Sequence, residues 1–154
     1  MANIEHSAIT DPNIHEPKGA ADADAGTVYV ADGAGSGDWS PIRDIYQGFF
    51  TDVSTAEVKY VPIAHSGTVV LVSTVLAAAI NTDNATVTAK NAAGASMGTI
   101  TVAYTSSAAG DVDTLVPASN NTVGANSFVT VETDGGSTGT APTSFLIVVE
   151  RSTV

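Results

Sequence analysis

Short segments rich in apolar and β-branched residues recur along most of the chain, some of them alternating with polar residues, and they constrain its fold more than any other feature. Clusters of Asn, Gly, Ser and Asp, which favour turns, separate them. Residues 85–90 and 99–104 alternate, and the further segments with strand character are residues 59–63, 68–72, 127–132 and 144–150. Successive side chains of a strand point to opposite faces of a sheet, so alternation indicates strands with one buried face. Short strands at this spacing are typical of sandwiches and barrels, and we predict an all-β, antiparallel, jelly-roll-like sandwich.

The longest apolar stretch, residues 69–80, fits two interpretations. Its alanines at 77–79 would tolerate a helix, but its β-branched residues favour a strand that runs into a loop. Two hydroxyl residues interrupt the stretch, and it is too short to span a bilayer. Earlier in the chain, Pro62 places its segment at a sheet edge or at a bulge, because proline cannot donate to a ladder.

The first 50 residues differ from the rest in composition. Prolines hold their neighbours extended, and small, acidic and glycine-rich stretches make up much of the segment. Residues 27–30 carry a short strand signal, while residues 40–46 fit a further strand or a turn. We therefore predict an extended N-terminal arm with a short hairpin over residues 1–50, followed by a sandwich and oligomerisation domain over residues 51–154.

The chain is strongly acidic, because 5 Lys and Arg stand against 16 Asp and Glu and give a net charge of −11. Binding to nucleic acid or to anionic membranes depends on clustered cations, so neither is an expected partner. The chain has no cysteine, which excludes disulfides and thiolate chemistry. Its first residues contain neither the basic nor the apolar stretch of a signal peptide.

Residues 94–98, Gly-Ala-Ser-Met-Gly, match the nucleophile elbow of serine hydrolases letter for letter. That motif works on a strand-turn-helix corner and needs a histidine later in the chain. Here the segment joins two predicted strands, and no histidine follows His65. The glycine-rich residues 33–37 likewise lack the Lys-Ser/Thr of a phosphate-binding loop. We interpret both segments as turns, and we expect no catalytic residues, no cofactor and no enzymatic activity.

Two pairs of carboxylates, Asp22 with Asp24 and Asp111 with Asp113, resemble the start of a calcium site. A hard cation takes six or more oxygen ligands, and the calcium-loop motif adds a further Asp or Asn, a Gly and a distant Glu. Neither pair has these, so we expect solvated loop acids and no metal, with the second pair the better candidate. The histidines show no ligand spacing and are scattered at positions 6, 15 and 65.

Aromatic residues gather near the end of the arm, where Phe49 and Phe50 follow Trp39 and Tyr46. We interpret the two phenylalanines as a packing anchor against the sandwich, with a contact between subunits as the alternative. Thr-rich strands give a modest core, and small domains gain stability when copies bury further area between them. The residues expected to build the core and the contact between copies are Phe49, Phe50, Val69, Leu71, Phe145 and Ile147.

Two stretches of the N-terminal part, Asp-Pro-Asn-Ile-His-Glu-Pro-Lys-Gly at 11–19 and Gly-Thr-Val-Tyr-Val-Ala-Asp-Gly-Ala-Gly-Ser-Gly-Asp-Trp at 26–39, carry a resemblance. They resemble the N-terminal segment of tailed-phage virion surface proteins, namely head-decoration proteins and head fibres. The second half is similar to a β-sandwich module of phage structural proteins. The residues that carry this second similarity are 60–64, 86–90, 98–104, 109–113 and 132–137.

The resemblance implies a non-enzymatic capsid decoration (cement) protein that binds the outer capsid surface through its arm and stabilises the head. The resemblance also implies that the major capsid protein is its partner and that the protein assembles as a homotrimer. It would be made in the host cytoplasm and located on the outer surface of the virion. The residues assigned to capsid binding are Pro12, Asn13, Ile14, His15, Glu16, Pro17, Val28, Tyr29, Val30 and Trp39. The alternative is a head-fibre or tail-fibre component whose sandwich binds a host receptor or a glycan, and copy number per virion separates the two.

Overall fold

The computed structural model describes residues 23, 26–32 and 37–152. The chain divides into two compact units, of which the second runs from Arg43 to Ser152. The described residues form strands and turns, without any helix that could cross a membrane. The predicted all-β fold with antiparallel sheets is confirmed for this part of the chain.

The first unit contains a β-hairpin. Strand β1 (Thr27–Ala31) pairs antiparallel with strand β2 (Gly37–Pro41). The amide of Ile42 donates to the carbonyl of Gly26 at 3.0 Å and closes the open end of the hairpin. Gly26 has a φ of 80°, a backbone conformation that favours glycine.

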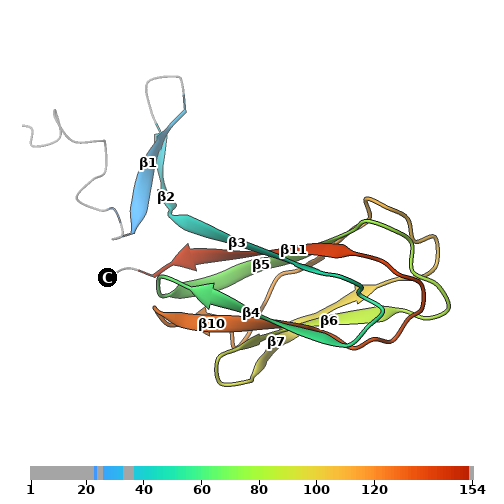
Figure 1. The fold of residues 1–154 in the computed structure, drawn as a ribbon. Coiled ribbons are helices and arrows are strands. Elements are labelled where there is room, and N and C mark those ends of the chain that lie inside the picture. The colour runs from blue at the N-terminus through green and yellow to red at the C-terminus, as the bar shows by residue number, and fades with distance from the viewer. Residues whose placement is uncertain (1–22, 24–25, 33–36, 153–154) are drawn as a thin grey trace, which may run out of the picture. The chain divides into compact units, whose positions relative to one another are not determined.

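The second unit is built from two antiparallel sheets that share one core (Figure 1). One sheet has the order β3 (Arg43–Phe50), β11 (Thr143–Arg151), β5 (Gly67–Leu76) and β8 (Val112–Leu115), and the short β9 (Thr122–Val123) also pairs with β5. The other has the order β4 (Glu57–Ile63), β10 (Ser127–Thr133), β6 (Ala85–Asn91) and β7 (Ser96–Val102). We refer to them as the β3 sheet and the β4 sheet. Figure 1 shows them as two layers, one above the other.

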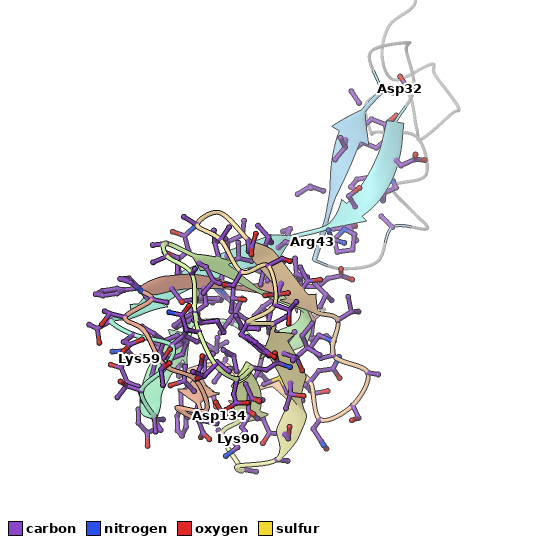
Figure 2. All side chains as sticks on the ribbon, turned by 90° about the vertical axis from the view of Figure 1, so that its right-hand side faces the viewer. Asp32, Arg43, Lys59, Lys90 and Asp134 are labelled. Carbon is purple, nitrogen blue, oxygen red and sulfur yellow. The ribbon has the colours of Figure 1, made fainter. Side chains whose placement is uncertain are left out.

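The core lies between the two sheets. The inward positions of every long strand contribute to it, and its largest fully buried side chains are Phe50, Ile63, Ile80 and Ile147. The ring of Phe50 packs against that of Phe145, with centroids 5.0 Å apart. Each such side chain stabilises the fold by roughly 1.5–3 kcal/mol through its removal from water. The side chains in Figure 2 fill the space between the layers, while Arg43 and Lys90 lie on opposite sides of the sandwich.

All six predicted segments lie in strands, namely β4, β5, β6, β7, β10 and β11, although residues 103–104 follow the end of β7. Pro62 lies on β4, an edge strand of its sheet, as predicted. The stretch 69–80 is strand up to Leu76 and irregular after it.

The division between the units falls after Ile42, eight residues before the boundary at residue 50 expected from composition. Residues 43–50 form β3, which pairs along its whole length with β11. Phe50 at its end is completely buried. Composition places this segment with the arm because it follows a glycine-rich stretch, but its partner strand lies about 100 residues later in the chain.

Close packing of β3 against β11 leads to a first prediction about Gly48. A Cβ atom at this position would lie 2.4 Å from Cζ of Phe145, whose ring is buried against the glycine. Gly48→Ala should therefore lower the free energy of unfolding by about 1–3 kcal/mol, the usual effect of overpacking a core. Urea titration monitored by circular dichroism measures the change.

Gly124→Ala is the matched control, because a Cβ atom there meets only the Cβ of Ser127 at 4.0 Å. We expect its free energy of unfolding to stay within about 0.5 kcal/mol of wild type. Equal stability of the two variants would contradict the packing of Phe145 on Gly48.

Candidate functional site

The hairpin presents an aromatic pair on one face. Tyr29 and Trp39 are directly opposite in the register of β1 and β2, and their ring centroids lie 5.4 Å apart at 65°. The ring of Tyr29 also lies over Gly37, where a Cβ atom would be only 2.9 Å from Cζ. Edge-to-face pairs of this kind add about 0.5–1.5 kcal/mol beyond area burial. The aromatic pair therefore holds the two strands in register.

The opposite face of the hairpin carries Val28 and Val30, which are 45% and 51% exposed. Their cross-strand neighbours are Ser40 and Asp38. A two-stranded hairpin is marginally stable in water by itself, and within the described residues β1 and β2 form a sheet of two strands only. Such a ribbon can pair with a strand of a partner, while its alternate side chains give specificity.

The predicted capsid-binding residues thus fall into two groups. Val28, Tyr29, Val30 and Trp39 lie together on the hairpin, two on each face. Residues 12–17 lie outside the described residues.

The residues predicted for the core and for the contact between copies are also divided by the structure. Phe50, Val69, Phe145 and Ile147 lie in the core. The other two, Phe49 and Leu71, point outward from the β3 sheet, and Phe49 is 60% exposed.

The outer surface of the β3 sheet is largely apolar, and we call it the apolar sheet face. Strand register arranges its outward side chains in rows that cross β3, β11, β5 and β8. One row contains Phe49, Ser144, Val75 and Val112; the next contains Gln47, Leu146, Ser73 and Thr114; and a third contains Ile45, Val148 and Leu71. Ile45 and Val112 are 63% and 59% exposed. Between the first two rows lies a hollow of about 330 Å³, and the small residues Gly48, Ser73 and Ser144 are among those that line it.

The β4 sheet presents a different outer surface. Tyr60 on β4 is 70% exposed and packs edge-on against Phe128 on β10, with centroids 5.5 Å apart. Pro62 lies directly opposite Phe128. Farther across the sheet, threonines and the ion pair of Lys90 with Glu132 replace the apolar residues. This surface is an aromatic patch beside hydroxyl groups, unlike the apolar sheet face.

At the start of β3, the guanidinium group of Arg151 forms a bidentate pair of hydrogen bonds with the carboxylate of Asp44. Nε of Arg151 donates to Oδ2 at 2.9 Å and Nη2 donates to Oδ1 at 2.6 Å, while Nδ1 of His65 lies 3.0 Å from Oδ2. The hydrogen bonds from Arg151, aided by His65, hold the pKa of Asp44 below its ordinary value of 3.8 although burial opposes them. The cluster joins β3 to the end of β11.

A pH prediction follows from this cluster. A carboxyl whose pKa is lowered on folding stabilises the folded state above its unfolded pKa, and this stabilisation is lost as the pH falls through the lowered value. We therefore expect wild type to lose more stability than Asp44→Asn when the pH is lowered from neutral to below 3.8. Urea midpoints at the two pH values measure the difference. Asp83→Asn, which removes an exposed carboxyl from a turn, is the control and should behave as wild type.

The serine of the Gly-x-Ser-x-Gly match lies at the beginning of a strand. Ser96 opens β7 directly after the turn that follows β6, and Gly94 in this turn has a φ of 79°. Oγ of Ser96 accepts from the amide of Gly98 at 3.1 Å. The segment is therefore a hairpin turn, as predicted, and lacks the strand-turn-helix corner of a nucleophile elbow.

The better of the two candidate carboxylate pairs lies at the edge of the β3 sheet. Burial, together with the negative charge of Asp111, raises the pKa of Asp113. Asp111 accepts a hydrogen bond from the amide of Ala108 at 2.7 Å. Among the described residues no group of three or more acidic, histidine or cysteine side chains could hold a metal ion. Asp22 and Asp24 lie outside the described residues.

The sequence indicated part of the apolar sheet face, since Phe49 and Leu71 are among the residues expected to build the core and the contact between copies, but it did not indicate Ile45 or Val112. Residues 145–149 are apolar without interruption, and so are residues 69–72. Unbroken apolar strands are typical of sheets that are covered on both faces, whereas the strands of a sheet with one face in water alternate between apolar and polar residues.

No protein-family model matches the chain, and no curated protein matches it in sequence.

Proposed function

We propose that this chain is a structural protein of a tailed-phage virion, a capsid decoration protein that binds the outer capsid surface through its hairpin. In this proposal a jelly-roll-like sandwich is the projecting body, and the N-terminal arm is the attachment element for the major capsid protein. The observation that carries the proposal is the hairpin, which belongs to the first of the two compact units and exposes valines on one face.

Two further features support this function. The resemblance to virion surface proteins covers residues 11–19 and 26–39, and the second of these stretches contains β1 and the first three residues of β2. A net charge of −11 keeps many copies soluble before they assemble. Attachment by strand addition requires backbone groups and small apolar contacts, which an acidic chain with few cations can supply.

The test is the amount and position of the protein in purified virions of the phage that encodes it. Quantitative mass spectrometry should find hundreds of copies per virion, and a cryo-electron microscopy reconstruction should place them on the outer capsid surface. Absence from purified virions would refute the proposal.

A fibre component is the second candidate, and the aromatic patch of the β4 sheet favours it. Exposed tyrosine beside hydroxyl groups suits a sugar ring, which stacks on an aromatic face and hydrogen-bonds at its rim. Tens of copies per virion or fewer, located on a fibre, would favour this candidate over decoration. Tyr60→Ala should then weaken binding to host cells, while Thr122→Ala, at an exposed threonine of β9 in the β3 sheet, should not.

A further inference from the structure

We propose that the apolar sheet face is a self-association surface, buried in solution against another copy of this chain. The occupant follows from the chemistry of the face, from its charge and from its size. Because the association is a property of the free protein, it does not depend on the proposed attachment to a capsid.

The face has the composition of an interface rather than of a solvated sheet. Ile45, Phe49 and Val112 are each 59–63% exposed, and Val75 is 38% exposed. They are distributed across β3, β5 and β8, so the apolar surface extends from one edge of the sheet to the other. Contiguous apolar surface of this kind marks interaction sites in soluble proteins.

A bulge enlarges the apolar surface at the middle of the sheet. The register between β11 and β5 shifts between Val148 and Val149, which face Leu71 and Val69. Val70 is the extra residue of the bulge, and its alternation with the buried Val69 directs it outward, next to Leu71. Both side chains are partly exposed. Two apolar side chains therefore occupy the outer face where a regular strand would place one.

The low charge of the apolar sheet face supports another copy of the chain as the partner that covers it. The chain carries −11, so two copies repel each other wherever acidic surfaces meet. The rows of the apolar sheet face contain no unpaired charge: at their end Arg43 lies 3.3 Å from Glu150, with which it shares a row. A neutral apolar face on an acidic molecule is where two copies approach with the least repulsion.

The size of the face is sufficient for a stable contact. Strands lie about 4.8 Å apart and rise about 3.3 Å per residue, so four strands of this length offer on the order of 450 Å² of flat sheet. Two faces together, with the relief of their side chains, bury about 1,000 Å² or more, the area that specific interfaces reach. The hollow beside Ser73 and Ser144 can receive a protruding side chain such as Phe49 from the other copy.

The experiment compares molar mass in solution. Light scattering on the full chain should give a mass of at least two copies of the 15.5 kDa chain. The double variant Ile45→Glu/Val112→Glu places like charges in the interface and should give the mass of one copy, with an unchanged β-sheet circular dichroism spectrum. Both residues are mostly exposed in the single chain, so the substitutions leave its core intact.

The matched control carries the same two charges elsewhere. Tyr60→Glu/Tyr104→Glu changes two exposed aromatic residues away from the apolar sheet face and should retain the wild-type mass. If wild type has the mass of one copy, the inference is overturned, because the apolar sheet face is then covered by the chain's own arm or by nothing. Equal masses for the two double variants would overturn it as well.

A labelling experiment keeps the inference testable if the charged variant does not fold. The chain has no cysteine, so Phe49→Cys and Tyr60→Cys each introduce a single thiol. Maleimide labelling at position 49 should slow several-fold as the protein concentration is raised, while labelling at position 60 should not change. Labelling of position 49 that is independent of concentration would contradict burial between copies.

Discussion

Removal of residues 1–50 should abolish folding of the sandwich, whereas removal of residues 1–42 should leave it intact. The shorter deletion keeps β3 and ends where the two units divide. The longer deletion removes a strand that pairs along its length with β11, together with the fully buried Phe50. Loss of one buried Phe side chain alone costs about 3–5 kcal/mol, and domains of this kind are stable by only about 5–15 kcal/mol.

Circular dichroism and urea titration of the two truncated proteins test this boundary. The protein starting at Arg43 should unfold cooperatively at a urea midpoint close to that of the full chain. The protein starting at Thr51 should lack a cooperative transition or aggregate, because the unpaired edge of β11 and the apolar inner surface are then exposed. Cooperative unfolding of both proteins at similar midpoints would show that β3 is dispensable.

The sequence predicted strands well wherever one face of a strand is buried and the other meets water. In β6, Val87 is buried while Thr86 and Thr88 are partly exposed, so alternation is visible without any knowledge of the partners. The strands β8 and β9 were not predicted. In β8 only four residues pair, with Asp113 and Thr114 among them, and β9 has two residues. Their pairing with β5 is decided by tertiary structure, which a local pattern does not contain.

The candidate surfaces were predictable only in part, for a related reason. The hairpin signal at residues 27–30 is local, and β1 contains it. The apolar run of residues 145–149 shows that both faces of its strand are apolar, but not which side chains reach the core. Burial of Phe145 and Ile147 and exposure of their neighbours depend on the position of the second sheet. Phe49 and Phe50 illustrate this: adjacent in sequence, one is 60% exposed and the other is fully buried.

The aromatic pair of the hairpin carries the second large expected effect. If the hairpin attaches the protein to the capsid, Tyr29→Ala/Trp39→Ala should weaken binding to capsids by tenfold or more while leaving the stability of the sandwich unchanged. The pair holds β1 and β2 together, and a two-stranded hairpin without it is too weakly ordered to be a template for strand addition. A loss of about 1.4 kcal/mol in binding free energy corresponds to tenfold in affinity.

Capsids prepared without this protein and sedimented with increasing concentrations of each variant measure the affinity. Asp38→Ala is the matched control, because Asp38 lies on β2 next to Trp39 but on the opposite face of the hairpin, across from Val30. It should bind as wild type, since it leaves the aromatic pair intact and removes a negative charge that is not needed for backbone pairing. Trp residues are frequent among the side chains that dominate binding energies, so the double variant also removes a direct contact if the aromatic face meets the capsid. If Tyr29→Ala/Trp39→Ala binds capsids with wild-type affinity, another part of the chain attaches the protein. If Asp38→Ala loses as much affinity as the double variant, the hairpin binds through charge rather than through strand pairing.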